Sequence, residues 1–424
     1  MKVLICQGET EYKDFLSQGS RENSYAMLKN LCFKVILLFL LLLNYGSYWM
    51  FLNKISKEIT FVIPFILSAG IFFVFVLKNK KISLRRFLVV LLLSANVLLS
   101  CIFNNDFSTD NFLLIISIFT AFFLVTSVNN NKIIKNYVQI IVFLSVYSLI
   151  ATYIILPLCL NGIIKFIPIY TNANRPYYDM GLTMCLGYYG VPRNNGFCRE
   201  PGVFQVYLVL AEFFLIEKFT KSKKNIVYSL IIAVTLLTTF SAVAYVCLVI
   251  IGVLILKKYS KDTKHSLKYC LSIIICVAII FCVVWSNQST RDELYRTFSK
   301  WLSLDSGSMK VRSAGIFLNL SLFFEKPIFG YGLVNSWFEI IKRSGLQDVT
   351  GTPLIAFAGC GIFFGTITNI FLLRFCRTNS KLDTFLCWLA IFISLSSQNL
   401  ILSFIFWITL LLKVPTKKEI FVEK

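Results

Sequence analysis

Long apolar runs constrain this chain more than any other feature. The segments 59–77 and 137–158 carry no charged residue, and each is close to the length of about 20 residues that spans a bilayer. Hydrophobic residues make up 57% of the 424 positions, which is more apolar surface than a soluble domain hides. In lipid only helices and closed barrels satisfy the backbone, and unbroken runs of this kind favour helices. The sequence therefore predicts an all-α integral membrane protein.

The apolar runs and the charges between them predict about twelve transmembrane helices. Lys and Arg collect in cytoplasmic loops, so basic turns are assigned inside and turns without Lys or Arg outside. Segments 226–256 and 385–412 have basic residues on both flanks. Two inner flanks require an even number of crossings, so each segment is predicted to form two short helices. Their outer turns are placed at 238–241 and 396–399. The other predicted spans are 33–51, 59–77, 87–103, 112–128, 137–158, 203–219, 267–285 and 353–373.

Both ends of the chain are predicted to be cytoplasmic tails. These tails, at 1–30 and 413–424, flank a membrane domain over 31–412. The first tail has no apolar core after a basic start, so no signal peptide is expected. Two large outer loops are predicted, at about 160–202 and 286–352.

Three charged residues do not fit this simple pattern. Lys54 and Lys57 lie in a turn that the span count places outside, against the charge rule. Glu212 lies within an apolar run, where a carboxylate is costly and usually functional. The alternative for Glu212 is that this helix ends lower in the membrane than predicted.

Neither the charge nor the cysteine content indicates a nucleic-acid site or a metal site. The net charge of +21 does not require a nucleic-acid partner, because positive charge also gathers in the inner loops of membrane proteins. The 13 cysteines form no Cys-x-x-Cys motif and no Cys/His cluster, so no metal site is expected. The single histidine, His265, lies in a Lys-rich loop, which leaves the outer loops without one. Cys185 and Cys198 share the first outer loop, and whether they form a disulfide is left open.

The first outer loop ends on the stretch Arg-Asn-Asn-Gly-Phe-Cys-Arg-Glu-Pro-Gly at 193–202, directly before an apolar span. Pro201 suits a first helical turn, and Glu200 precedes the positive end of the helix dipole. Together with Arg193 and Arg199, this helix terminus could bind a phosphate or pyrophosphate. An ordinary interfacial cap with snorkelling arginines is the alternative.

Other parts of the outer loops suggest binding surfaces. The first loop is rich in Tyr and Asn, which suit the faces and hydroxyls of sugars but equally suit a membrane-interface belt. Segment 311–325 has apolar residues at near-helical spacing and is predicted to lie along the membrane surface. The Gly-Tyr-Gly at 330–332 is interpreted as a turn.

Three stretches resemble the bacterial O-antigen polymerase and ligase superfamily. The first is Arg-x-x-Gly-Phe-x-x-Glu-Pro-Gly at 193–202. The second is Leu-Leu-Thr-Thr-Phe-Ser at 236–241, ahead of a helix of small residues. The third is Ser-Gly-Ser at 306–308 with Arg312, followed by Glu-Lys-Pro-Ile-Phe-Gly-Tyr-Gly at 325–332.

The chain departs from the family at two positions. Ala242 follows Thr-Phe-Ser, where many members have arginine. Ligases use a histidine in the second outer loop, and here 351–353 reads Gly-Thr-Pro. The resemblance, which covers roughly 137–412, therefore favours the polymerase branch.

The resemblance implies a multi-pass protein of the bacterial inner membrane that acts at the periplasmic face on undecaprenyl-pyrophosphate-linked glycans. An acceptor hydroxyl attacks the anomeric carbon of the donor and the lipid pyrophosphate leaves, without a metal or another cofactor. The expected function is polymerisation of oligosaccharide repeat units into O antigen, capsule or exopolysaccharide. An O-antigen ligase and a lipid-linked glycan flippase or transporter are the alternatives. Besides the glycans and membrane lipid, a chain-length regulator and a flippase are candidate partners, and no nucleic acid is expected.

The candidate site residues follow from this chemistry. Departure of a pyrophosphate needs fixed positive charge, which bidentate arginines supply better than lysines. Arg193, Arg199 and Arg312 are the candidate catalytic arginines. Glu200 is the nearest carboxylate to take the acceptor proton, and the alternative is that it orients an arginine. The candidate substrate-binding residues are Arg175, Tyr177, Tyr178, Gly196, Ser241 and Gly330.

Overall fold

The computed structural model describes most of the chain from residue 28 onward. The described residues are 28, 30–52, 54–78, 82–165, 167–172, 175–186, 192–216, 222–259, 288, 291–292, 307–346 and 349–412. The chain divides into two units, Met1–Leu41 and Leu42–Lys424, and each is considered by itself. An apolar helix over Asn30–Leu42 accounts for what is described of the first unit.

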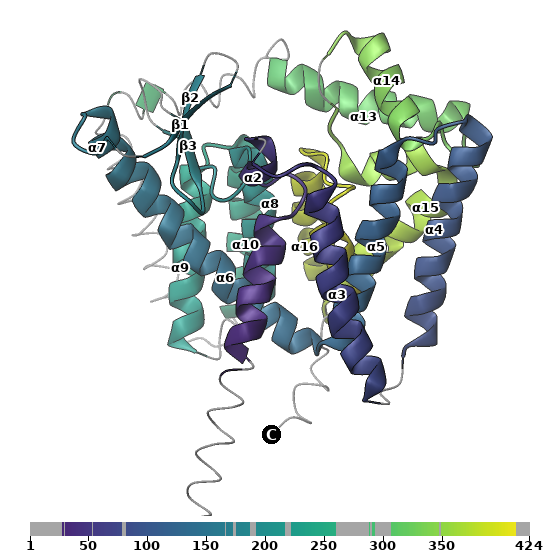
Figure 1. The fold of residues 1–424 in the computed structure, drawn as a ribbon, viewed down its shortest axis with the longest axis horizontal. Coiled ribbons are helices and arrows are strands. Elements are labelled where there is room, and N and C mark those ends of the chain that lie inside the picture. Colours follow the sequence, from purple (N-terminus) through teal and green to yellow (C-terminus); the bar gives the residue numbers. More distant parts are fainter. Residues whose placement is uncertain are drawn as a thin grey trace, which may run out of the picture. The chain divides into compact units, whose positions relative to one another are not determined.

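The second unit is built of helices (Figure 1). Five helices of the described residues are long and apolar enough to cross a membrane. Four are α3 (Ile59–Leu77), α4 (Leu84–Asn104), α5 (Thr109–Ser127) and α15 (Thr352–Phe375), and the fifth runs over Asn130–Leu160 through α6 (Asn130–Ile150), a π-helical turn (Ala151–Ile155) and α7 (Leu156–Leu160). Each matches one predicted span, so the chain is an all-α membrane protein in its coarse architecture.

The two predicted helix breaks are confirmed. Segment 226–256 divides into α9 (Lys223–Thr238) and α10 (Ala242–Tyr259). The break at 396–399 separates α16 (Lys381–Ser396) from α17 (Phe404–Leu411).

The helix at the twelfth predicted crossing is short. α17 has 8 residues, and at about 1.5 Å per residue it is far shorter than the hydrocarbon core of about 30 Å. All eight side chains of α17 are buried in protein. The predicted span at 267–285 lies outside the described residues. The count of twelve therefore stays a prediction.

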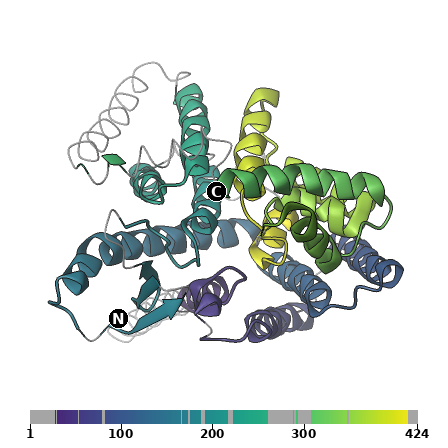
Figure 2. The ribbon, with the colours of Figure 1, turned by 90° about the horizontal axis from the view of Figure 1, so that it is seen from above.

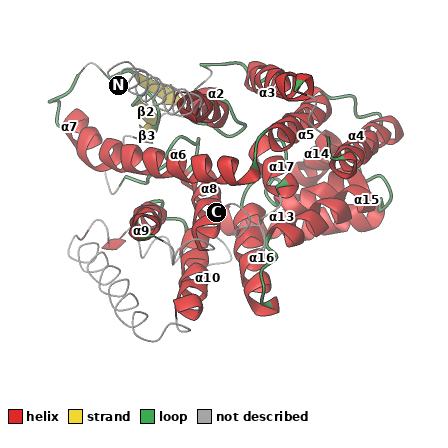
Figure 3. Ribbon diagram, turned by 90° about the horizontal axis from the view of Figure 1, so that it is seen from below, coloured by secondary structure: helices red, strands yellow, loops and turns green. Residues whose placement is uncertain are grey.

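The helix α8 (Pro201–Ile216) lies beside α10 and α16 in the interior of the second unit (Figure 3). Glu212 is buried inside α8, and the Ser229 hydroxyl of α9 lies 2.8 and 3.0 Å from its two carboxylate oxygens. α8 is described as far as Ile216, four residues beyond this carboxylate, so where the helix end lies in the membrane stays a prediction.

Two contacts join segments that the sequence predicts on the same side. At turns predicted outside, Asn104 Nδ2 donates to the carbonyl of Gly330 at 3.1 Å. At turns predicted inside, Arg86 Nη1 donates to the carbonyl of Val125 at 3.2 Å. The side on which each turn lies stays a prediction.

The two lysines that break the charge rule are both neutralised. Lys54 and Lys57 follow the short helix α2 (Tyr48–Phe51). Lys54 forms an ion pair with Asp179, and Lys57 forms one with Asp110. Lys54 Nζ also lies 5.7 Å from the ring centre of Tyr170. Carboxylates of other predicted outer segments therefore compensate the positive charge in this turn.

Part of the first outer loop is a small sheet, which the all-α prediction did not include. β1 (Ile169–Asn172), β2 (Arg175–Asp179) and β3 (Met184–Leu186) pair antiparallel in the order β1-β2-β3. The loop lacks the long apolar runs that dominate the chain, so its short strands gave no comparable signal.

Two helices lie at the same end of the second unit as this sheet (Figure 1). α13 (Gly307–Glu325) contains the predicted amphipathic helix at 311–325, and it lies over α15 in the view from above (Figure 2). α14 (Leu333–Ser344) was not predicted. The carboxylate of Asp106, in the α4–α5 turn, accepts the amide of Val334 at 2.9 Å and so caps α14 from outside the helix.

Candidate functional site

The candidate site is assembled from five segments that the sequence predicts on the outer side. They are the end of the first outer loop at 192–202, the α9–α10 turn, the first half of α13, the residues 349–352 and the α16–α17 turn.

Gly196 is buried and sets the backbone conformation of the loop. Its φ is 54°, and a Cβ there would lie 2.5 Å from the ring of Phe204 in α8. Its amide donates to Asn194 Oδ1 at 2.9 Å, and its carbonyl accepts from the hydroxyl of Thr183. A glycine is required because the buried backbone turns left-handed against an aromatic ring. Gly196 therefore acts on substrate binding only through the conformation of the loop.

Arg193 closes the C-terminal end of α9. Its Nε donates to the carbonyl of Thr239 at 3.1 Å, and its Nη2 donates to the carbonyl of Phe240 at 2.9 Å. Next to it, the amide of Asn194 donates to the carbonyl of Thr238 at 3.0 Å. A cation at a helix C-terminus is favourable, since the last carbonyls point outward there. The cap interpretation thus describes part of what Arg193 does.

Phe240 holds the α9–α10 turn in an unusual conformation. It has a φ of 46°, in the left-handed region that bulky residues rarely adopt. Strained backbone persists where its surroundings hold it in place, and Arg193 and the buried ring supply such contacts.

Arg312 shares an electrostatic neighbourhood with the first outer loop. Burial lowers the pKa of this α13 guanidinium, and the positive charge of Arg193 lowers it further. The carboxylate of Glu200 raises the pKa of Arg312 and so opposes these two effects. Two charged groups of the first outer loop therefore act on the guanidinium of an arginine from a distant part of the sequence.

Arg199 and Glu200 form an ion pair at the start of α8. Arg199 Nε lies 3.4 Å from Glu200 Oε1, and the Arg199 amide donates to the carbonyl of Gly46 at 2.9 Å. The side chain of Glu200 is 48% exposed. Its carboxylate is thus accessible to an incoming group while it contacts one of the candidate arginines.

Gln398 connects the loop to α13, and sequence reasoning gave it no role. Its side chain lies against Gly202, where a Cβ would meet it. Its carbonyl accepts the amides of Gly351 and Thr352 at 3.2 and 3.1 Å. Thr350 in turn lies against Gly315 of α13. This chain of contacts joins α8 to the helix that carries Arg312.

Ser241 lies between Phe240 and the first residue of α10. Its side chain is buried, and its hydroxyl has no hydrogen-bond partner among the described residues. Because Arg193 binds the carbonyl of Phe240, Ser241 belongs to the same part of the site.

Gly330 packs against α15. The stretch 330–332 connects α13 to α14 with a bend at Tyr331, and a Cβ at Gly330 would lie 2.6 Å from the backbone of Gly359 in α15. The amides of Tyr331 and Gly332 donate to carbonyls of α15 at 2.8 and 2.9 Å. These amides are occupied by packing against α15, so the turn offers them to no ligand.

The three predicted residues of β2 lie on the small sheet. The ring of Tyr177 lies 5.6 Å from that of Phe51 in α2, whereas Tyr178 packs on the opposite side with Met180. Arg175 is the first residue of β2.

The disulfide left open by the sequence is not formed. Cys185 and Cys198 are both free, buried thiols. Burial raises the pKa of Cys185 to about 12, and its sulfur lies 3.6 Å from the hydroxyl of Thr152. Over the described part of the chain, no group of three or more His, Cys, Asp or Glu side chains is placed to hold a metal ion.

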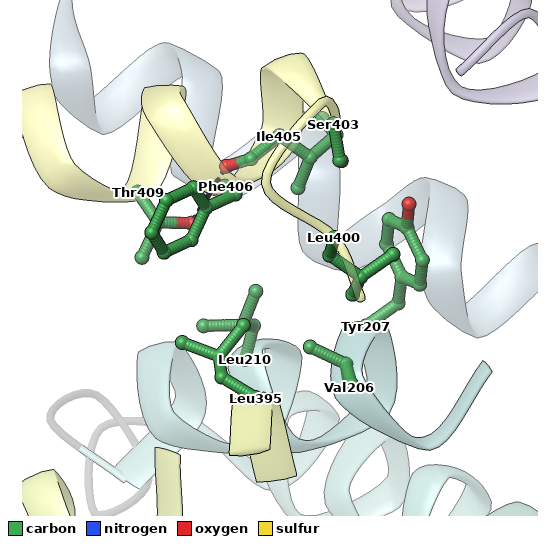
Figure 4. A pocket seen from close by; sticks show the side chains of 9 residues that line it. All are labelled: Val206, Tyr207, Leu210, Leu395, Leu400, Ser403, Ile405, Phe406 and Thr409. Carbon is green, nitrogen blue, oxygen red and sulfur yellow. Dashed lines mark hydrogen bonds between the residues drawn. The ribbon is translucent and has the colours of Figure 1, made fainter. Parts of the chain in front are cut away.

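A small cavity lies between α8 and the α16–α17 segment (Figure 4). It has room for about one water molecule. The Tyr207 hydroxyl at the edge of the cavity accepts a hydrogen bond from the side-chain amide of Asn44, so this hydroxyl already has a partner. The cavity is too small for a sugar and belongs to the packing beneath the site. Its lining residues are Val206, Tyr207, Leu210, Leu395, Leu400, Ser403, Ile405, Phe406 and Thr409.

No protein-family model matches the chain, and neither does any curated protein or any solved structure.

Proposed function

We propose that this protein is a polymerase that joins undecaprenyl-pyrophosphate-linked repeat units into O antigen, capsule or exopolysaccharide at the periplasmic face of the bacterial inner membrane. The observation that carries the proposal is that contacts through Gln398 join the start of α8 to α13, and that Arg193 and Glu200 act electrostatically on the guanidinium of Arg312. Two like charges held together, partly buried and beside one carboxylate, favour an anionic ligand that neutralises them.

Glycosyl transfer from a lipid pyrophosphate requires positive charge for the leaving group and a base for the acceptor. In glycosyl transfer the acceptor oxygen forms a bond to the anomeric carbon, and the bond from that carbon to the pyrophosphate oxygen breaks. The leaving pyrophosphate takes the electron pair, so negative charge grows there in the transition state. Fixed guanidinium groups stabilise such charge best in a site that excludes water. The acceptor proton needs a base, and Glu200 is the exposed carboxylate beside the arginines.

Lysine substitution tests the proposal because it keeps the charge and removes the bidentate geometry. We would express Arg193→Lys and Arg312→Lys in a strain that lacks the gene, and compare polysaccharide ladders. Each variant should reduce polymer at least about tenfold, since one lost donor to a developing oxyanion slows related reactions about 100-fold or more. Arg377→Lys, at a turn predicted inside, is the matched control and should leave the ladder unchanged.

The lipid-linked glycan that accumulates in the deletion strain separates the three candidate functions. A missing polymerase leaves single repeat units on the carrier at the outer leaflet. A missing ligase leaves finished polymer on the carrier, and a missing flippase leaves single repeat units facing the cytoplasm. Either of the last two results, or full ladders from both lysine variants, would overturn the proposal.

A further inference from the structure

The hydroxyl of Tyr153 binds the start of the stretch 192–202, here called the motif loop. It donates to the carbonyl of Pro192 at 3.0 Å, and it lies 3.5 Å from the carbonyl of Thr238 at the end of α9. Pro192 directly precedes Arg193 in the chain. One side chain thus bridges the loop that carries a candidate catalytic arginine and the helix end that this arginine caps.

The residue that follows Arg193 is held at the same helix end. The amide of Asn194 donates to the carbonyl of Thr238 at 3.0 Å, which is the carbonyl that the Tyr153 hydroxyl also approaches. The backbone is therefore fixed on both sides of Arg193. Tyr153 supplies the contact on the N-terminal side, and the protein backbone supplies the one on the C-terminal side.

Tyr153 lies in the π-helical turn that follows α6. This turn runs from Ala151 to Ile155, and π-helical turns inside α-helices are frequent at functional sites. The preceding residue, Thr152, has its hydroxyl 3.6 Å from the sulfur of Cys185 in β3. Consecutive residues of one turn thus contact the small sheet and the motif loop.

Two other tyrosines of the same long helix bind elsewhere. The Tyr147 hydroxyl donates to the carbonyl of Met180 in the first outer loop, and the Tyr137 hydroxyl donates to a carbonyl of α8 at 3.0 Å. Neither of these carbonyls belongs to the motif loop. Tyr147 therefore provides a control of the same residue type, on the same helix and with the same kind of hydrogen bond.

We propose that Tyr153 is a positioning residue for Arg193. Its hydroxyl fixes the backbone directly before the arginine and so determines where the guanidinium lies, without contacting a substrate. A displacement of about 1 Å in a catalytic group can cost about 100-fold in rate. That this orientation serves glycosyl transfer rests on the proposed function. That Tyr153 orders the motif loop does not.

The first experiment measures polymerisation of a lipid-linked repeat unit by the full-length protein in nanodiscs. Tyr153→Phe removes the hydroxyl and keeps the ring. It should lower kcat at least about tenfold and change KM less than about twofold, because a misplaced group loses mainly transition-state stabilisation. In an Arg193→Lys background the same change should cost less than about twofold, since effects that act through one group do not add. Tyr147→Phe should leave kcat unchanged.

The second experiment depends on no reaction. Hydrogen exchange of the Asn194 amide reports on the backbone beside Arg193, because this amide donates to Thr238. Tyr153→Phe should speed the exchange about two- to tenfold, the value of one lost hydrogen bond. Tyr147→Phe should leave it unchanged, and the thermal midpoint is measured for both variants.

The two experiments separate the possible roles of Tyr153. A merely structural role predicts a lower thermal midpoint and an equal loss of kcat in both arginine backgrounds, and that result overturns the proposal. Unchanged exchange at Asn194 in Tyr153→Phe overturns it as well. If the wild type polymerises no repeat units, the proposed function falls, and the exchange rates alone decide whether Tyr153 orders the motif loop.

Discussion

Arg193 performs two tasks with one side chain. Its hydrogen bonds to Thr239 and Phe240 hold the α9–α10 turn, while its charge acts on Arg312 across the site. The sequence presented a cap and an anion site as alternatives, and the geometry permits both. An arginine fixed by backbone carbonyls is already oriented, so little order is lost when a ligand arrives.

Glu200 gives the sharpest prediction at this scale. As an exposed partner of Arg199 it stabilises the pair by about 0–1 kcal/mol, whereas a general base contributes about 100-fold or more to rate. We expect Glu200→Gln to lower polymer formation at least about 100-fold in ladder assays while protein level and thermal midpoint stay unchanged. A drop of less than fivefold would instead assign Glu200 the task of orienting Arg199.

Among the elements, α14 depends on a residue far away in the sequence. Its N-cap position is Gly332, with a φ of 86°, and a Cβ there would collide with Asp106. The buried carboxylate of Asp106 caps the helix instead. Asp106→Ala should destabilise the protein by about 0.5–2 kcal/mol, the usual loss for an N-cap. Thermal unfolding in nanodiscs would measure it, with Glu58→Ala as the exposed control that changes the midpoint little.

The α13–α14 connection should respond to acid. The pKa of Glu325 is lowered from its ordinary 4.5 to about 2. The hydrogen bond from Arg343 is the largest cause, and the one from Tyr331 is the next. A depressed carboxyl pKa stabilises the folded state above the ordinary value, and this contribution disappears as the pH falls through the folded value. Hydrogen exchange of α14 amides should thus be slower in wild type than in Arg343→Ala at pH 5 and above, with the difference fading toward pH 2. A difference that persists at pH 2 would contradict this assignment.

The elements also show what sequence can predict. Flanking charges located the breaks at 238–241 and 396–399, because each break depends only on local composition and the side of the membrane. The cap on α14 and the contacts of Gln398 were beyond reach, since each joins separate elements that lie far apart in the sequence. The motif arginines of the candidate site came from residue type and order along the chain, and their catalytic role stays a prediction.

For the whole molecule, function depends on which side faces outward. The site gathers only segments predicted outside, and the two lysines against the charge rule are paired with Asp110 and Asp179. The predicted topology therefore has no other exception to the rule that Lys and Arg lie on the inner side. It also makes the sidedness of the helices a direct test of the proposed function, because a lipid-linked repeat unit is polymerised at one face only.

Single cysteines would report this sidedness. Phe107, 62% exposed in the α4–α5 turn, and Asn379, exposed before α16, lie at turns predicted on opposite sides. In a Cys32→Ser background, a membrane-impermeant maleimide should label Phe107→Cys in intact spheroplasts and Asn379→Cys only after permeabilisation. Buried native cysteines should react slowly, and the Cys32→Ser protein alone gives their background. The reverse pattern would turn Arg193 and Arg312 toward the cytosol, where no periplasmic glycan could reach them.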